Sequence, residues 1–267
     1  MCRLVDQKAH GSRLAIAVLA CSKGAEVYSI LWRIRTARPD LKVTLQAVDI
    51  SPEIVEFARE GTYSLKDPAD LKTPDHRAMT EEEKLLCMTY RDQGSDQRAS
   101  IFERLSGAEL EAMFDIEGDQ AKVKSWLKDG VTWRVGDASD PGLVRALGSQ
   151  DLVVANRFLC HMEPAAAERC LRNIADLVKP GGHLFVSGVD LDVRTKVAKQ
   201  LAWRPVPDLI KEIHQGDPSL ATGWPLGWWG LEPFCENHAD RRIRYASVFR
   251  IGTAPSFEPD EPTSPSV

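Results

Sequence analysis

A turn of small residues and a carboxylate that follows it are the strongest chemical signals in this chain. The turn, residues 20–24, reads ACSKG, and the carboxylate is Asp49. Small side chains let a ligand approach the backbone N–H groups at the start of a helix, which carry partial positive charge. A carboxylate about 20 residues or slightly further on can accept hydrogen bonds from both hydroxyls of a ribose. Together the two features predict a site for an adenosine-type ligand.

This turn differs from the glycine-rich loop of dinucleotide-binding proteins, because only Gly24 is a glycine. A dinucleotide with its pyrophosphate therefore fits the turn poorly, whereas an adenosine ligand without phosphate, such as S-adenosylmethionine, fits it better. An alternative stays open at this point. Any parallel α/β domain has a turn of this kind, and Asp49 could simply cap the helix that follows it.

Polar side chains also follow three apolar runs that read as strands, at residues 131–135, 151–155 and 183–189. In an α/β sheet, ligands bind in the crevice outside the carboxyl ends of the strands. The polar residues at these ends are Asp137, Asn156, Arg157, His161 and Asp190. Asp137 precedes a helix opened by a proline, so it suits either an adenine amino group or a helix cap.

The elements that must position these groups are indicated by the apolar spacing. Residues 14–20 form an apolar run that reads as a strand, and residues 43–48 form the next one. Between them a helix is predicted by apolar residues at helical spacing, namely Val27, Ile30, Leu31 and Ile34. Ser51 and Pro52 then open a helix that Gly61 ends. This order is typical of a nucleotide-binding α/β fold.

The second half of the chain adds a helix that starts at Glu163-Pro164 and an alternating strand over residues 245–251. Cys170 lies on the apolar stripe of that helix, so we expect a core residue and not a reactive thiol. Tryptophans within residues 203–235 either wall off an acceptor pocket or cover the open edge of the sheet.

The domain organisation follows from composition along the chain. We expect a short leader or the remnant of a helix at residues 1–13, one domain over residues 14–252, and a disordered tail over residues 253–267, which is rich in Pro, Ser and acidic residues. Residues 62–130 are charged and read as an insertion of two or three helices. The insertion is either a lid that recognises an acceptor or a solvated decoration.

Bulk composition bounds the class of protein. The 267 residues are 43% hydrophobic and 27% charged, with a net charge of −5, so nothing indicates a nucleic-acid partner. No apolar run approaches the length of a membrane span, and the polar N-terminus lacks a signal-peptide core. Six cysteines occur without C-x-x-C pairs, which indicates reduced thiols, a cytoplasmic location and no metal site.

Two segments resemble the signature of the chemotaxis receptor (CheR-type) methyltransferases, namely CSKGAEVYS and AVDISPEIVEFAREGTYSL. The stretches LSGAELEAMF, DLVVANRFLCHM and LVKPGGHLFVSG are similar to later segments of that family. The resemblance covers roughly residues 14–190. It implies a class I, Rossmann-like methyltransferase fold, with a mostly parallel seven-stranded sheet, helices on both faces and a helical insertion. It also implies S-adenosylmethionine as the cofactor.

The resemblance also implies roles for individual residues. Asp49 and Ile50 would bind the ribose, and Asp137 and Ala138 would lie by the adenine. The methionine end would be held by Ala20, Cys21, Ser22, Gly24 and Glu26. The cofactor would be lined at the fourth strand by Asn156 and Arg157.

Several positions depart from the family pattern. Ala25 replaces the first of two glutamates, Asn156-Arg157 reverses an Arg-Asn pair, and His161 stands where the family has a tyrosine near the transferred methyl group. We also expect the chain to lack the family's N-terminal helical domain. These departures favour an acceptor other than a receptor glutamate, either a small molecule or another protein carboxylate.

Methyl transfer needs a base only when the acceptor is a hydroxyl or an amine, because a carboxylate is already ionised. His161 is the first candidate base and Asp190 the second. A structural imidazole is the alternative for His161. Two other functions stay open: a cofactor-binding sensor or scaffold without turnover, and a different adenosine-binding enzyme such as an oxidoreductase. We expect no nucleic-acid or membrane partner, and the sequence is compatible with a homodimer.

Overall fold

The computed structural model describes residues 1–65, 102, 105–217, 220 and 230–252. Predictions for residues 66–101, for Trp224, Trp228 and Trp229, and for the tail 253–267 lie outside the described residues.

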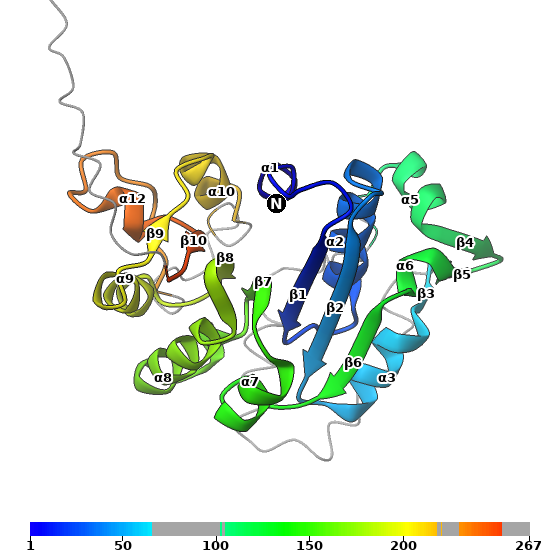
Figure 1. The fold of residues 1–267 in the computed structure, drawn as a ribbon, viewed down its shortest axis with the longest axis horizontal. Helices are drawn as coiled ribbons and strands as arrows, with labels where there is room; N and C mark the ends of the chain where they lie inside the picture. Colours follow the sequence, from blue (N-terminus) through cyan, green and yellow to red (C-terminus); the bar gives the residue numbers. More distant parts are fainter. Residues whose placement is uncertain (66–101, 103–104, 218–219, 221–229, 253–267) are drawn as a thin grey trace, which may run out of the picture.

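A seven-stranded sheet, ordered β6-β2-β1-β7-β8-β10-β9, organises the fold (Figure 1). Its strands are β1 (Arg13–Leu19), β2 (Lys42–Asp49), β6 (Val131–Val135), β7 (Gln150–Asn156), β8 (Val178–Ser187), β9 (Arg204–Pro205) and β10 (Val248–Arg250). The five strands from β6 to β8 pair in parallel, and β10 runs antiparallel to both of its neighbours. The predicted class I, Rossmann-like sheet is confirmed.

Helices cover both faces of this sheet, as predicted. They are α1 (Cys2–Val5), α2 (Ala25–Ala37), α3 (Pro52–Glu60), α7 (Pro141–Leu147), α8 (Pro164–Ala175), α9 (Leu191–Gln200), α10 (Ile210–Gln215) and α12 (Arg241–Arg244), with a 3₁₀ turn at Leu159–His161. Strand residues alternate between faces, so Ala17 and Leu19 of β1 face the core under α8, and Ile16 and Val18 face the core under α2. In Figure 1, α8 and α9 lie beside β8, and α3 lies beside β6.

The helix starts predicted from capping residues are confirmed. The Ser51 hydroxyl accepts a hydrogen bond from the N–H of Ile54, and Pro52 occupies the first turn of α3. Gly61 ends that helix in the left-handed conformation. Glu163 and Pro164 likewise open α8.

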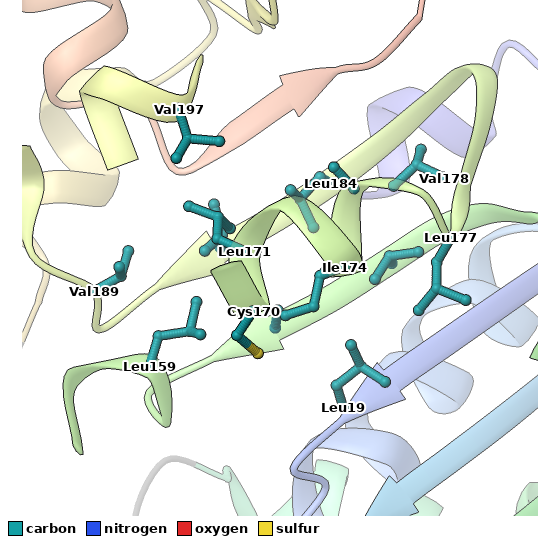
Figure 2. Close-up of a cluster of buried hydrophobic side chains, with 14 of the residues drawn as sticks. Leu19, Leu159, Cys170, Leu171, Ile174, Leu177, Val178, Leu184, Val189 and Val197 are labelled. Carbon is teal, nitrogen blue, oxygen red and sulfur yellow. The ribbon is translucent and has the colours of Figure 1, made fainter. Parts of the chain in front are cut away.

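The core under α8 contains the cysteine that the apolar stripe places there. Figure 2 shows Cys170 on α8, among side chains that point toward the sheet and toward the segments at its ends. Its labelled neighbours include Leu19, Leu159, Leu171, Ile174, Leu184 and Val189. Burial raises the pKa of the Cys170 thiol to about 12, so the interpretation as an inert core residue is confirmed.

The inserted region differs from the prediction of helices alone. A three-stranded antiparallel sheet, ordered β3-β5-β4, stands between α3 and β6. Its strands are β3 (Thr62–Ser64), β4 (Phe114–Glu117) and β5 (Gln120–Val123), and two short helices accompany them, α5 (Gly107–Met113) and α6 (Ser125–Lys128). The rings of Tyr63, Phe102 and Phe114 pack edge to face with centroids 5.3–6.2 Å apart. The strands were missed because three or four residues are too few to show alternation.

Three further observations concern the start of β8, the N-terminal residues and Trp203. The strand predicted over residues 183–189 begins earlier, because β8 starts at Val178, with a register irregularity between Gln150 and Leu152 of its partner β7. Residues 1–13 contain the short helix α1, whose Val5 is buried. Trp203 is buried against Phe249 of β10, with ring centroids 5.4 Å apart.

No helix in the described ranges is both long enough and apolar enough to cross a lipid bilayer. The same residues contain no group of three or more His, Cys, Asp or Glu side chains suited to a metal ion.

Candidate active site

The crevice at the carboxyl ends of the strands opens where the chain reverses direction across the sheet. After β1 the chain moves to β2 on one side, and after β7 it moves to β8 on the other, so β1 and β7 form the topological switch point. The turn at residues 20–24 follows β1, and Asp49 ends β2. Asn156 ends β7. Predicted cofactor residues from distant parts of the sequence therefore meet at one edge of the sheet.

The turn after β1 holds two residues in a backbone conformation that side chains disfavour. Ala20 and Ser22 have φ angles of 51° and 47°, and Gly24 has a φ of 82°. Three hydrogen bonds hold the turn: Cys21 N–H to Val48 O at 2.9 Å, Gly24 N–H to Cys21 O at 3.0 Å, and Ser22 N–H to Asp49 Oδ2 at 2.8 Å. Strained residues of this kind gather at ligand sites, where the surrounding structure fixes their conformation.

The structure excludes one of the two roles that the sequence left open for Asp49, the cap of the following helix. Ser51, and not Asp49, caps α3. Asp49 Oδ2 accepts from Ser22 N–H, and Oδ1 accepts from Ser51 N–H at 3.2 Å. Each carboxylate oxygen has two lone pairs, so both oxygens can still accept a bond from a ribose hydroxyl.

A chain of hydrogen bonds connects the turn side of the crevice to β7 and β8. Ser187 Oγ donates to Asn156 Oδ1 at 2.9 Å, and Asn156 Nδ2 donates to Glu26 Oε1 at 2.6 Å. Burial raises the pKa of the Glu26 carboxyl, and the bond from Asn156 partly offsets that rise. Glu26 lies in the first turn of α2, so its carboxylate occupies the helix end where a phosphate would otherwise bind.

Exposed apolar side chains flank Asp49. Ile50 is 68% exposed and Val135 is 53% exposed, and Val135 is the register partner of Asp49 across β2 and β6. Val135 was absent from the predicted site. Two exposed apolar groups beside a carboxylate that can accept ribose hydroxyls would suit the faces of an adenine ring.

The loop after β6 also resolves an alternative. Asp140 caps α7 by accepting from Gly142 N–H at 2.7 Å, so Asp137 is not the cap. Asp137 is exposed and its Oδ1 accepts from Ser139 N–H and Oγ, both at 2.8 Å. Ala138 beside it is buried, and its carbonyl accepts from Asn173 Nδ2 at 3.0 Å.

The two candidate bases, His161 and Asp190, differ in their surroundings. His161 is exposed in the 3₁₀ turn after β7, where partial desolvation and then the charge of Arg157 lower its pKa. Asp190 caps α9, and its Oδ1 accepts from Asp192 N–H at 2.8 Å and Val193 N–H at 3.1 Å. The carboxylate of Asp190 therefore has a structural role, because it caps the first turn of α9.

A cavity of about 290 Å³ adjoins the crevice on the far side of Asn156. It lies on the α2 face of the sheet, because Phe185 packs with the core under α2 while Leu184 and Val186 pack under α8. Its walls come from the ends of β7 and β8 and from α9, α10 and β10. The polar side chains that line it are Asn156, Arg157, Ser187, Arg194, His214, Asp217 and Ser247.

Arg157 was predicted to line the cofactor, but the structure places it on this cavity. Its guanidinium Nη1 lies 3.5 Å from Asp217 Oδ1. Ser187, Arg194 and His214 were not predicted as site residues. Arg194 carried a usable signal, since it occupies the apolar stripe of α9 between Leu191 and Val197, where a charged residue is unusual.

Comparison with known proteins agrees with this site. Residues 1–85 match the family model described as "CheR methyltransferase, SAM binding domain", and residues 98–186 match the one described as "Methyltransferase domain". Both models describe methyltransferases, and each match covers about a third of the chain. The first match spans the turn at residues 20–24 and Asp49, the two features from which the cofactor was predicted.

A curated relative is an uncharacterized 104.1 kDa protein in the hypE 3′ region of Rhodobacter capsulatus. It is 27% identical over 200 residues, which are 72% of this chain and 17% of that protein. The chain thus spans about a sixth of the length of the relative it matches.

Solved structures of methyltransferases share a general likeness. An O-methyltransferase family protein from Burkholderia thailandensis is 14% identical at a TM-score of 0.37, over 92% of this chain and 45% of that chain. Magnesium protoporphyrin IX methyltransferase from Synechocystis PCC 6803, with bound S-adenosylmethionine, is 14% identical at a TM-score of 0.38, over 77% and 66%.

Proposed function

We propose that this protein transfers a methyl group from S-adenosylmethionine to a small molecule, or to a protein carboxylate or other heteroatom, that enters through the cavity beside Asn156. The hydrogen bond between Asn156 and Glu26 carries the proposal. It joins Asn156, in the wall of the cavity, to the carboxylate of Glu26 in the crevice, with 2.6 Å between Asn156 Nδ2 and Glu26 Oε1. Because Asn156 contacts both the crevice and the cavity, it marks the place where a methyl donor and an acceptor can meet.

The charges of the crevice fit this cofactor. Glu26 and Asp49 are both carboxylates, and S-adenosylmethionine carries positive charge on its sulfonium and its amino group. A pyrophosphate would meet the same two carboxylates as like charges, which is unfavourable in a partly buried site. The acidic lining thus supports an adenosine cofactor with a cationic end over a dinucleotide.

The residues have distinct tasks in this proposal. Asp49 would accept the ribose hydroxyls, Glu26 would pair with the amino group, and Ile50 and Val135 would contact the adenine. The cofactor supplies an electrophilic methyl group when it is bound. The main contribution of the protein is to hold donor and acceptor in line, since correct positioning alone can supply about 7–11 kcal/mol of the barrier.

A hydroxyl or amine acceptor would require a base, and His161 remains the candidate on its exposed turn. Its lowered pKa keeps the ring neutral at physiological pH, which is the form of an imidazole that accepts a proton. A carboxylate acceptor would not require it.

Two measurements test the proposal. Calorimetric titration with S-adenosylmethionine and S-adenosylhomocysteine should show binding that Asp49→Ala weakens by about 10- to 100-fold, because charged hydrogen bonds are worth about 1.5–3 kcal/mol. Asp115→Ala is the matched control, since Asp115 is exposed on β4 far from the crevice. Absence of binding to the unaltered protein would refute the proposal.

Turnover is then measured with methyl-labelled cofactor against a panel of metabolites and peptides. Transfer of label to any acceptor supports an enzyme. Cofactor binding with no transfer to any of them would instead favour a sensor or scaffold that retains the fold, a function that Ala25 in the cofactor turn first suggested.

A further inference from the structure

We propose that the cavity beside Asn156 selects acceptors that carry a single carboxylate, and that Arg194 is the residue that binds this group. The inference rests on the proposed function, because it names the class of acceptor for that site.

Arg194 is a buried cation with an unused donor. The residue is 3% exposed and lines the cavity from α9. Its Nη1 donates to the carbonyl of Val186 at 3.2 Å, and its Nη2 donates to the carbonyl of Arg244 at 2.8 Å. Its Nε has no hydrogen-bond partner among the residues that the structure describes. Buried donors are almost always satisfied, so an unsatisfied one beside a cavity indicates a missing acceptor group.

The charged side chains around the cavity also favour an anionic ligand. The charged side chains that line it, within the described ranges, are Arg157, Arg194 and Asp217. Asp217 lies 3.5 Å from Arg157. Arg244, the next cation, already pairs with Glu232 and Asp192. These three lining side chains carry one net positive charge, which one negative charge on a ligand would balance.

His214 adds no charge to this balance. Its Nε2 lies 2.8 Å from the carbonyl oxygen of Glu232, and a carbonyl can only accept, so Nε2 carries the proton. Burial lowers the pKa of His214, which keeps the ring neutral. Its Nδ1 then holds a lone pair and cannot donate to an anion. Arg194 remains the donor that an anionic group would meet.

The size of the cavity limits the ligand. Its volume of about 290 Å³ is at the lower end of the range for small-molecule sites. A single net charge matches a monocarboxylate better than a phosphate, which carries nearly two negative charges at neutral pH. A planar carboxylate also suits the geometry of a guanidinium.

The test uses benzoate as the probe and benzamide as its uncharged match, in calorimetric titrations of the full chain. Benzoate should bind at least about 10-fold more tightly than benzamide, as expected for a charge-assisted hydrogen bond. Arg194→Met should abolish the difference. Arg194→Lys, which keeps the charge and loses the fork of donors, should reduce it. Equal binding of the two probes, or no binding of either, would overturn the inference.

Asp217→Asn keeps the test decisive if the Arg194 variants do not fold. Removing the negative charge raises the net charge of the cavity, so benzoate should bind more tightly and benzamide should not change. Unchanged or weaker benzoate binding would contradict the proposal. Inorganic phosphate is the third probe, and tighter binding of phosphate than of benzoate would replace the carboxylate class with a phosphorylated one.

A parallel titration with S-adenosylhomocysteine separates this inference from the proposed function. Binding of the nucleoside without selectivity for benzoate would overturn the role of Arg194 alone. Selectivity for benzoate without binding of the nucleoside would refute the methyltransferase proposal and leave a carboxylate site.

Discussion

Asn156 Nδ2 donates to Glu26 Oε1 across 2.6 Å, and so connects the end of β7 to the first turn of α2. The same amide accepts from Ser187 Oγ through Oδ1. One side chain thereby partly offsets the rise that burial causes in the pKa of Glu26, while it forms a wall of the adjoining cavity.

Replacing Asn156 should make cofactor binding more sensitive to acid. In Asn156→Ala, the buried Glu26 loses the hydrogen bond that lowers its already raised pKa, so the pKa rises further. Because the ionised carboxylate binds the cationic cofactor, affinity should fall by about 10-fold or more at neutral pH. The pH below which binding is lost should move upward.

Calorimetric titration with S-adenosylhomocysteine at a series of pH values measures both effects. Ser187→Ala is the control, since it removes the outer bond and leaves the donor to Glu26 in place. The same pH dependence in Asn156→Ala and the unaltered protein would contradict the prediction.

Gly188 and Gly118 form a matched pair that isolates crowding from backbone strain. Both have a φ of 58°, where a side chain costs about 1 kcal/mol. A Cβ at Gly188 would lie 2.5 Å from the Cα of Arg157, whereas none of the surrounding atoms lies within 4 Å at Gly118. Gly188→Ala should therefore destabilise the fold by about 1–3 kcal/mol more than Gly118→Ala. Urea unfolding of both variants measures this, and equal losses would show that the close approach of the two strand ends is unimportant.

Asp151 should stabilise the fold at neutral pH and cease to do so in acid. Burial would raise its pKa, but hydrogen bonds from Ala15 N–H, Lys179 and Lys8 outweigh burial and leave the pKa below the usual 3.8. A carboxyl with a lowered pKa stabilises the folded state above its unfolded pKa, and this contribution is lost as pH falls through the folded value.

Asp151→Asn should accordingly cost about 2–3 kcal/mol at pH 7, and the difference should narrow below about pH 4. Denaturant unfolding at both pH values gives the comparison, with exposed Asp115→Asn as the reference. A difference that persists unchanged in acid would mean that packing, and not charge, accounts for the loss.

The buried thiols should resist alkylation. Burial, with a smaller contribution from Asp49, raises the pKa of Cys21 to about 12, and burial raises that of Cys170 to about 12. Cys235 is exposed. Iodoacetamide at mildly alkaline pH, followed by peptide mass mapping, should modify Cys235 in the folded protein, and Cys21 and Cys170 only after urea is added. Rapid labelling of Cys170 in the folded state would contradict its place in the core.

Local elements of this protein could be predicted because their causes lie within a few residues. The apolar spacing of Val27, Ile30, Leu31 and Ile34 is a property of one helix, and the Ser51 side chain accepts from the N–H of Ile54, only three residues away. The same reasoning failed for β3, β4 and β5, since short strands depend on partners far away in sequence.

The sequence by itself determined the class of fold, the cofactor turn and the carboxylate of Asp49. Only the tertiary structure decided that Arg157 faces the cavity and that Glu26 bonds with Asn156. It also brought Ser187, Arg194 and His214 around one cavity. Those residues belong to β8, α9 and α10, and no spacing along the chain predicts that they meet, because the crossovers of the sheet and the packing of helices on its faces place them together.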